Sequence, residues 1–195
     1  MNVINMKTLE FQKDFLIEEI KQGKIFIYPT DTVYGIGCDA TNDNAVKKIF
    51  EIKQRENKPL LIIAPSKQWI YNNCEVNQTQ KTEIESKLPG PFSFILQLKE
   101  SSIENNLISK ELLCDKNTIG VRIPDAKFTY LISESQIPFV TTSVNISGEP
   151  SALKFEDIPK EILNQVDYLI ETNEKLLGKS SSIFDLTTDE IKQLR

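Results

Sequence analysis

The sequence contains no histidine, and this absence removes several kinds of chemistry. Nucleophile systems that depend on a histidine base, such as Ser-His-Asp and Cys-His, are excluded, and so is a metal ion held by histidine. Any reaction must therefore use carboxylates, lysine, arginine, hydroxyls, backbone amides or a metal ion that arrives with a substrate.

Cysteine is also scarce. Cys38, Cys74 and Cys114 are far apart and form no C-x-x-C pair, which argues for reduced thiols and against a thiolate zinc site. No apolar stretch approaches the length of a membrane span, and the N-terminus lacks the basic and then apolar order of a secretory signal. These features predict a cytoplasmic protein in which the sequon at Asn145 carries no glycan.

Arginine is rare although basic residues are not. Of the 23 basic residues only Arg55, Arg122 and Arg195 are arginine. A chain that uses lysine for surface charge can reserve arginine for sites where its planar fork binds a carboxylate or a phosphate. The net charge of −5 argues against a protein that binds nucleic acid through bulk electrostatics.

Apolar periodicity over the 195 residues predicts an α/β fold with a twisted mixed sheet flanked by helices. No linker divides the chain, so we expect a single domain over residues 1–195. The predicted helices are 8–22, 41–53, 79–88, 127–134 and 155–163. The predicted strands are 24–29, 59–65, 91–99, 118–124, 137–143, 166–171, 180–186 and 190–194.

Two glycine motifs imitate phosphate loops. In "YPTDTVYGIGCDA" (28–40), Gly35, Gly37 and Ala40 have the spacing G-x-G-x-x-A, but the first glycine is too far from the preceding strand and the next helix begins after new capping residues. "GKSS" (178–181) lacks the leading glycine of a P-loop, because position 173 is asparagine, and a strand rather than a helix follows it. Both dinucleotide and P-loop sites are rejected.

Three other segments carry candidate site residues. Lys53 and Arg55 lie where a helix ends before Pro59, a position that is usually a solvated helix end. Arg122 interrupts an apolar strand, so it is either an edge residue or a ligand for a carboxylate in a cleft. The polar stretch "TTSVNISGEPS" (141–151) follows a buried strand, where open α/β sheets commonly bind ligands, although a polar turn is the simpler interpretation.

Taken in order, "YPTDTVYGIGCDA", K-x-R before "PL", "PGPFSFIL", "GVRIP", "TSVNISGEPS" and "SSIFDL" resemble the YrdC-like family over nearly the whole chain. Lys53-x-Arg55 and Ser143-x-Asn145 match the family's signature tetrad. The resemblance implies a concave ligand groove and the activity of the TsaC-type members, which are threonylcarbamoyl-AMP synthases. They convert L-threonine, bicarbonate or carbon dioxide, and ATP with Mg²⁺ into threonylcarbamoyl-AMP and pyrophosphate. A threonylcarbamoyl-transferase complex of the TsaD type uses the product to modify tRNA.

The resemblance also implies roles for individual residues. The four residues of the tetrad are the expected catalytic residues: Lys53 and Arg55 would neutralise the triphosphate and its developing charge, and Ser143 and Asn145 would hold the adenylate region. The other expected ATP contacts are Lys58, Thr118, Ser151 and Arg195. The expected threonine contacts are Thr30, Thr32, Arg122 and Ser181, with Arg122 gripping the carboxylate. The glycines of residues 28–40 would shape a tight turn in the wall of this site. No protein ligand for a metal is expected, since Mg²⁺ would bind through the ATP phosphates.

The chain departs from the family pattern at two places. "RENKPL" (55–60) is shorter than in many relatives, which affects the role of Lys58, and relatives usually continue beyond the position of Arg195. The rival predictions are a YciO-type paralogue, a protein that handles carbamoyl-adenylate and an RNA-binding module. The acidic net charge speaks against tight binding of free nucleic acid.

Overall fold

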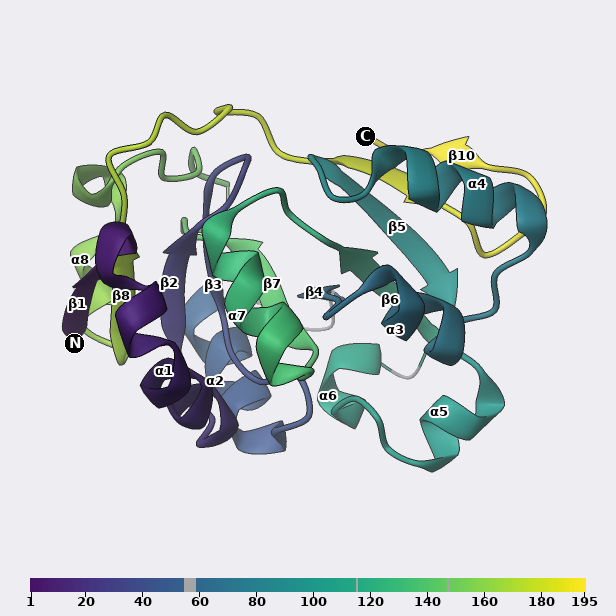
Figure 1. Cartoon of the computed structure of the whole chain (residues 1–195), viewed down its shortest axis with the longest axis horizontal. Helices are drawn as coiled ribbons and strands as arrows, with labels where there is room; N and C mark the ends of the chain where they lie inside the picture. Colours follow the sequence, from purple (N-terminus) through teal and green to yellow (C-terminus); the bar gives the residue numbers. More distant parts are fainter. Residues whose placement is uncertain (55–58, 115, 147) are drawn as a thin grey trace.

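The computed structural model of the chain describes residues 1–54, 59–114, 116–146 and 148–195. Within these residues ten strands form one sheet in the order β1-β8-β2-β3-β7-β4-β6-β5-β9-β10, and helices cover it (Figure 1). The pairs β1–β8, β2–β8, β4–β6 and β5–β9 are parallel, and the other neighbours are antiparallel. The expected α/β fold with a mixed sheet is confirmed.

The elements have the following bounds. The strands are β1 (Asn2–Asn5), β2 (Phe26–Pro29), β3 (Tyr34–Gly37), β4 (Leu61–Ile63), β5 (Phe92–Gln97), β6 (Thr118–Arg122), β7 (Phe139–Ser143), β8 (Tyr168–Glu171), β9 (Ser182–Asp185) and β10 (Lys192–Gln193). The helices are α1 (Lys13–Lys21), α2 (Asp43–Lys53), α3 (Lys67–Asn73), α4 (Gln78–Lys87), α5 (Glu100–Glu104), α6 (Lys110–Leu113), α7 (Lys127–Ser135) and α8 (Lys160–Leu163), with 3₁₀ helices η1 (Met6–Thr8), η2 (Glu10–Gln12) and η3 (Phe155–Asp157).

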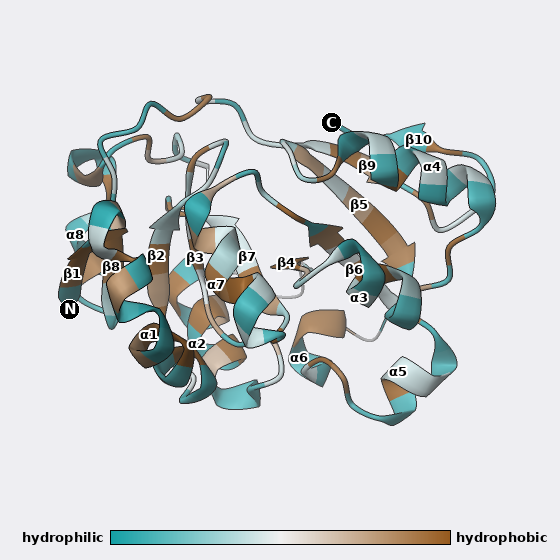
Figure 2. Ribbon diagram, viewed as in Figure 1, coloured by the Kyte–Doolittle hydropathy of each residue, from teal (hydrophilic) through white to brown (hydrophobic). Residues whose placement is uncertain are grey.

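Strand β2 is buried on both faces, and its alternating side chains define the two layers of helices. Ile27 points into the core cluster that also contains the apolar side of α2. Phe26 and Tyr28 point into a second cluster with α1 and α7, where the Tyr28 and Phe128 rings stack with their centroids 4.1 Å apart. In Figure 2 the strands carry brown segments in both halves of the sheet, whereas α4 is mostly teal and white.

Helix α2 begins with its own cap. The Asn42 side chain accepts a hydrogen bond from the Ala45 N–H at 3.1 Å, as expected for an N-cap. The buried residues Val46, Ile49 and Ile52 then recur at helical spacing. The helix therefore opens after Ala40 and independently of the glycines before it, as the sequence indicated.

The expectation that Gly35 and Gly37 shape a tight turn is wrong, because both residues belong to β3. They are needed for close packing. A β-carbon on Gly37 would lie 1.7 Å from the Val140 carbonyl oxygen, and one on Gly35 would lie 3.1 Å from the Tyr28 ring. Glycine at these positions lets the neighbouring backbone and the aromatic ring approach the strand.

Several predicted helices differ in extent. The first helix begins at Lys13, because η1 and η2 occupy the preceding turns, and it ends before Gly23, which has a φ of +75°. The predicted helix 155–163 is divided into η3 and α8, since Pro159 has no N–H to continue the ladder. The short elements β1, α3, α5 and α6 were not predicted. No helix in the described ranges is long and apolar enough to cross a membrane.

Candidate active site

A cavity of about 630 Å³ opens over the central strands of the sheet. It lies on the same face as α1 and α7, since Phe139 and Ile63 pack under these helices while Thr141 and Leu61, two residues away in each strand, line the cavity. The described residues that line it and were predicted as site residues are Thr30, Thr32, Thr118, Arg122, Ser143, Ser181 and Arg195. The fold therefore assembles residues from the beginning, middle and end of the chain in one place.

Strand β6 forms part of the floor of this cavity. Thr118, Gly120 and Arg122 alternate toward it, while Ile119 and Val121 point into the core on the other side. Strand β6 lies between β4 and β5, so Arg122 is not an edge residue. A polar side chain at this central place requires partners within the protein or a ligand in the cavity.

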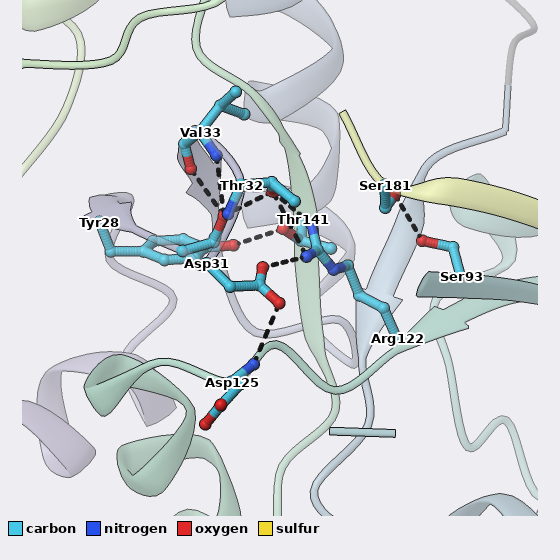
Figure 3. A network of polar contacts seen from close by, with 10 residues as sticks. Tyr28, Asp31, Thr32, Val33, Ser93, Arg122, Asp125, Thr141 and Ser181 are labelled. Atoms are coloured by element: carbon cyan, nitrogen blue, oxygen red, sulfur yellow. Dashed lines mark hydrogen bonds and ion pairs between the residues drawn. The ribbon is translucent and has the colours of Figure 1, made fainter. Parts of the chain in front are cut away.

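Arg122 is only 6% exposed and has an acidic partner. Its Nη2 atom lies 2.6 Å from Asp31 Oδ1, and Thr32 Oγ1 lies 3.3 Å from Nη1 and 3.4 Å from Nη2 (Figure 3). Burial lowers the pKa of the Arg122 guanidinium, and the charge of Asp31 opposes this effect. Among the described residues, no group accepts a hydrogen bond from the buried Nε atom. The guanidinium is thus charged, held on one side and incompletely satisfied.

Hydroxyl groups surround this arginine in fixed positions. The Thr30 hydroxyl contacts that of Thr32 at 2.8 Å and donates to the Val33 carbonyl at 2.7 Å, which makes a compact turn after β2. Tyr28 donates to Thr141 Oγ1 at 2.7 Å, and burial raises the pKa of this tyrosine. These hydroxyls present a polar wall whose orientation is set by hydrogen bonds.

The opposite wall begins at Ser181. Its hydroxyl lies 2.8 Å from that of Ser93, which is fully buried, and its carbonyl accepts a hydrogen bond from Arg195 Nε at 3.0 Å. Figure 3 shows the two serines facing each other across β5 and the start of β9. Ser93 and Arg195 therefore fix the place of Ser181 in the wall.

The described members of the signature tetrad are in direct contact. Lys53 Nζ donates to the Ser143 carbonyl at 2.7 Å, to the Asn145 carbonyl at 2.5 Å and to Asn145 Oδ1 at 2.9 Å. Ser143 Oγ donates to the same Oδ1 at 2.7 Å. Lys53, at 5% exposure, is thus a buried cation that fixes the loop after β7.

Not every predicted site residue lies in the cavity. Arg55 and Lys58 are outside the described residues. Ser151 is not among the lining residues, although the next residue, Ala152, donates to the Val144 carbonyl at 3.2 Å beside the tetrad loop. Asn145 and Lys53 reach the cavity wall through Ser143.

The sequence-based prediction missed several lining residues, including Lys116, Thr141, Asp185 and Thr187. Strand periodicity could have identified two of them, because Thr141 is two residues before Ser143 and Asp185 is four after Ser181. Asp185 is the single carboxylate in the described lining, and its Oδ1 accepts from the Thr187 N–H at 2.9 Å and from the Thr187 hydroxyl at 2.7 Å. Across the described residues no cluster of three or more His, Cys, Asp or Glu could hold a metal ion.

Comparison with known proteins gives consistent matches. The Sua5/YciO/YrdC family profile, described as telomere recombination, matches residues 18–195. A protein of Methanocaldococcus jannaschii, provisionally named as a threonylcarbamoyl-AMP synthase, is 40% identical over 184 residues, which cover 93% of this chain and 84% of the relative. The threonylcarbamoyl-AMP synthase of Pyrococcus abyssi is 32% identical over 171 residues, which cover 86% of this chain and 48% of the relative.

Solved structures share the architecture. Pyrococcus abyssi Sua5 complexed with L-threonine matches with a TM-score of 0.87 at 27% identity, over 100% of this chain and 57% of that chain. Escherichia coli YciO matches with a TM-score of 0.82 at 23% identity, over 99% of this chain and 93% of that chain, a likeness of fold alone. This chain spans about half the length of the Pyrococcus protein.

Proposed function

Because this chain belongs to the Sua5/YciO/YrdC family, we propose that it is a threonylcarbamoyl-AMP synthase. The names of the two relatives support this activity, and the L-threonine complex of Sua5 supports threonine as the amino acid. The other substrates would be bicarbonate or carbon dioxide and ATP. The product would pass to a threonylcarbamoyl-transferase of the TsaD type in the cytoplasm, where it would modify tRNA.

The observation that carries this proposal is the buried guanidinium of Arg122 in the floor of the cavity. Its Nε–H has no acceptor among the described residues, and hydroxyls of Thr30, Thr32, Thr141 and Ser181 line the same space. A carboxylate matches the guanidinium fork, and a hydroxy amino acid matches a wall of hydroxyls. L-Threonine carries both groups.

The proposed reaction needs no protein nucleophile, which suits a chain without histidine. The threonine amine attacks carbon dioxide and loses a proton, giving a carbamate. A carbamate oxygen then attacks the α-phosphorus of ATP, and the bond to the bridging oxygen of pyrophosphate breaks. The protein contributes by holding the reactants in line and by stabilising negative charge as it develops.

Residues on the two walls would divide this work. Arg122, with Thr30, Thr32 and Ser181, would hold threonine. The nucleotide would be contacted by Thr118, Ser143, Ser151 and Arg195. The charge of the triphosphate would be neutralised by Arg55 and Lys58, which precede Pro59 in the sequence. Lys53 would support the nucleotide site by fixing Ser143 and Asn145, since its ammonium donates to three oxygens of that loop.

Magnesium fits this site as a companion of ATP. The described lining offers only the Asp185 carboxylate, and Mg²⁺ is commonly bound through one or two carboxylates together with substrate phosphates. When bound, the ion would supply positive charge to the phosphate oxygens.

Pyrophosphate release tests the proposal directly. The protein should release pyrophosphate from ATP only when both L-threonine and bicarbonate are present. L-Serine lacks one methyl group and should be a poorer substrate by about 10- to 200-fold, the usual discrimination for one such contact. Equal release with unrelated amino acids, or none with threonine, would instead favour a YciO-type or carbamoyl-adenylate activity.

A further inference from the structure

Asp31 lies behind Arg122, on the side away from the large cavity. It does not line that cavity, but lines a second one of about 340 Å³ with Asp125, Lys127, Thr172 and residues 174–177. The side chains of Asp31 and Arg122 are only 8% and 7% exposed. The ion pair between them is therefore shielded from solvent, where a charge contact is strong and a misplaced charge is costly.

Asp31 is itself fixed by backbone contacts on two sides. Its Oδ2 atom accepts a hydrogen bond from the Asp125 N–H at 3.2 Å, just beyond β6 (Figure 3). Its carbonyl accepts from the Leu177 N–H at 3.2 Å, in the segment that connects β8 to β9. The carboxylate cannot swing into the large cavity without losing the bond to Asp125.

Asp31 binds only one nitrogen of the Arg122 guanidinium. Nη2 donates a hydrogen bond to Asp31 Oδ1, while Nε lacks an acceptor in the described part of the chain. The remaining N–H groups are thereby kept in a fixed direction instead of rotating about the long side chain. A side chain that is already ordered loses less rotamer freedom when a ligand binds, so the contact with Asp31 lowers the entropic cost of binding to Arg122.

We propose that Asp31 is a positioning residue that orients Arg122 for the substrate carboxylate. This inference rests on the proposed function, because it assigns Asp31 a part in binding the amino acid. An asparagine could not replace it fully. An amide that accepts from Arg122 would turn its own N–H₂ toward the Asp125 N–H, and the reverse orientation would face the guanidinium with a donor.

A double-mutant cycle in the full chain tests the inference. Asp31→Asn should raise the KM for threonine about tenfold and change the KM for ATP less than twofold. In an Arg122→Lys background the same substitution should add less than twofold, because Asp31 acts only through the arginine fork. Asp31→Glu keeps the charge and should recover part of the threonine affinity. It replaces Asp31→Asn in the experiment if the asparagine variant does not fold.

The matched control is Glu174→Gln. This carboxylate lines the same small cavity but is 65% exposed, paired with Lys127 at 2.8 Å, and its loss should leave both KM values unchanged. An unchanged threonine KM in Asp31→Asn, or an equal factor in both backgrounds, would overturn the inference alone. Wild-type protein without threonine-dependent pyrophosphate release would remove the proposed function and this inference with it.

Discussion

Arg122 forms a buried ion pair with Asp31 and also lines the large cavity. Replacing it with lysine keeps the charge but removes the fork. If it binds the threonine carboxylate, Arg122→Lys should raise the threonine requirement about ten- to a hundredfold, since a charge-assisted hydrogen bond contributes about 1.5–3 kcal/mol. The ATP requirement should stay nearly constant. Titration of each ligand against initial rates measures both.

The opposite result has a clear meaning. A lysine variant with normal threonine dependence would show that Arg122 does not bind threonine and has only a structural role, as the partner of Asp31. A loss of thermal stability together with weaker binding of both ligands would assign it to the framework of the sheet.

Lys53 offers a second test among single residues. Lys53→Met removes a cation that donates to three oxygens of the loop after β7, while retaining most of the side-chain volume. Buried acceptors left without a donor cost about 1–3 kcal/mol each. We expect turnover to fall at every threonine concentration and the KM for ATP to rise, as measured by pyrophosphate release.

Lys47→Met is the control for this experiment. Lys47 lies on the same helix, but its side chain is 56% exposed and its ion pair with Glu111 spans 3.4 Å. Exposed pairs contribute little, so turnover should not change. Equal losses in the two variants would point to a general effect on α2.

Among the elements, β3 shows most clearly how glycine permits close packing. Gly37→Ala would place a methyl group 1.7 Å from the Val140 carbonyl, and backbone cannot yield as a flexible side chain does. We expect unfolding free energy to fall by about 3 kcal/mol or more, at the upper end for overpacking. Gly35→Ala should cost less, because its new methyl would meet the Tyr28 ring at 3.1 Å. Urea denaturation measures the unfolding free energy of both variants. Similar losses in the two would contradict the explanation by contact with the Val140 backbone.

The elements also show where sequence patterns are sufficient. Helix α2 follows from its apolar period and its capping residue, and strands such as β5 and β7 follow from their apolar runs. Strand β3 was missed because glycines in a sequence usually indicate a turn. Their role in this strand depends on the residues that pack against them, which the sequence pattern does not reveal. Helix α3 was missed although Ser66 caps it with a bond from the Trp69 N–H at 3.0 Å, since seven residues give little periodicity.

Sequence patterns also identified only part of the candidate site. Family motifs identified residues that project into the cavity, including Arg122 and Ser181. They did not assign a role to the partners behind them, Asp31 and Ser93, although both residues lie within the quoted motifs, because these contacts join segments that are distant in sequence. Such pairings depend on the order of strands in the sheet, which no local pattern contains.

At the scale of the molecule, buried thiols should make the protein sensitive to alkaline pH. Burial raises the pKa of Cys74 to about 12 from an ordinary value of 9.0, and also raises that of Cys38. Above pH 9 the unfolded chain loses these protons while the folded chain keeps them, so stability decreases as pH rises. Each thiol contributes a slope of up to about 1.4 kcal/mol per pH unit.

Urea unfolding between pH 8 and pH 10.5 measures this slope. Cys74→Ala should flatten it, whatever its effect on stability at pH 8. Ile84→Val removes a buried methyl group and no ionisable group, so its loss of stability should be the same at each pH. An unchanged slope in Cys74→Ala would show that the thiol does not titrate as its burial indicates.

The overall charge leads to a prediction about RNA. With a net charge of −5, the chain should bind free duplex RNA weakly, and the binding should disappear at physiological salt. Fluorescence anisotropy with a labelled duplex, over a range of salt concentrations, provides the measurement. A sub-micromolar complex at physiological salt that ignores ATP would favour the RNA-binding class.

The place of β8 in the sheet has a consequence for how the chain acquires its structure. This strand, Tyr168–Glu171, lies between β1 and β2, which precede it by well over a hundred residues. Until it inserts, β2 has an unpaired edge whose residues are all buried in the folded protein. Parallel pairing across such separations is slow, and an exposed apolar edge attracts other chains. The interval between the synthesis of β2 and that of β8 is therefore the period when a nascent chain is most vulnerable to aggregation.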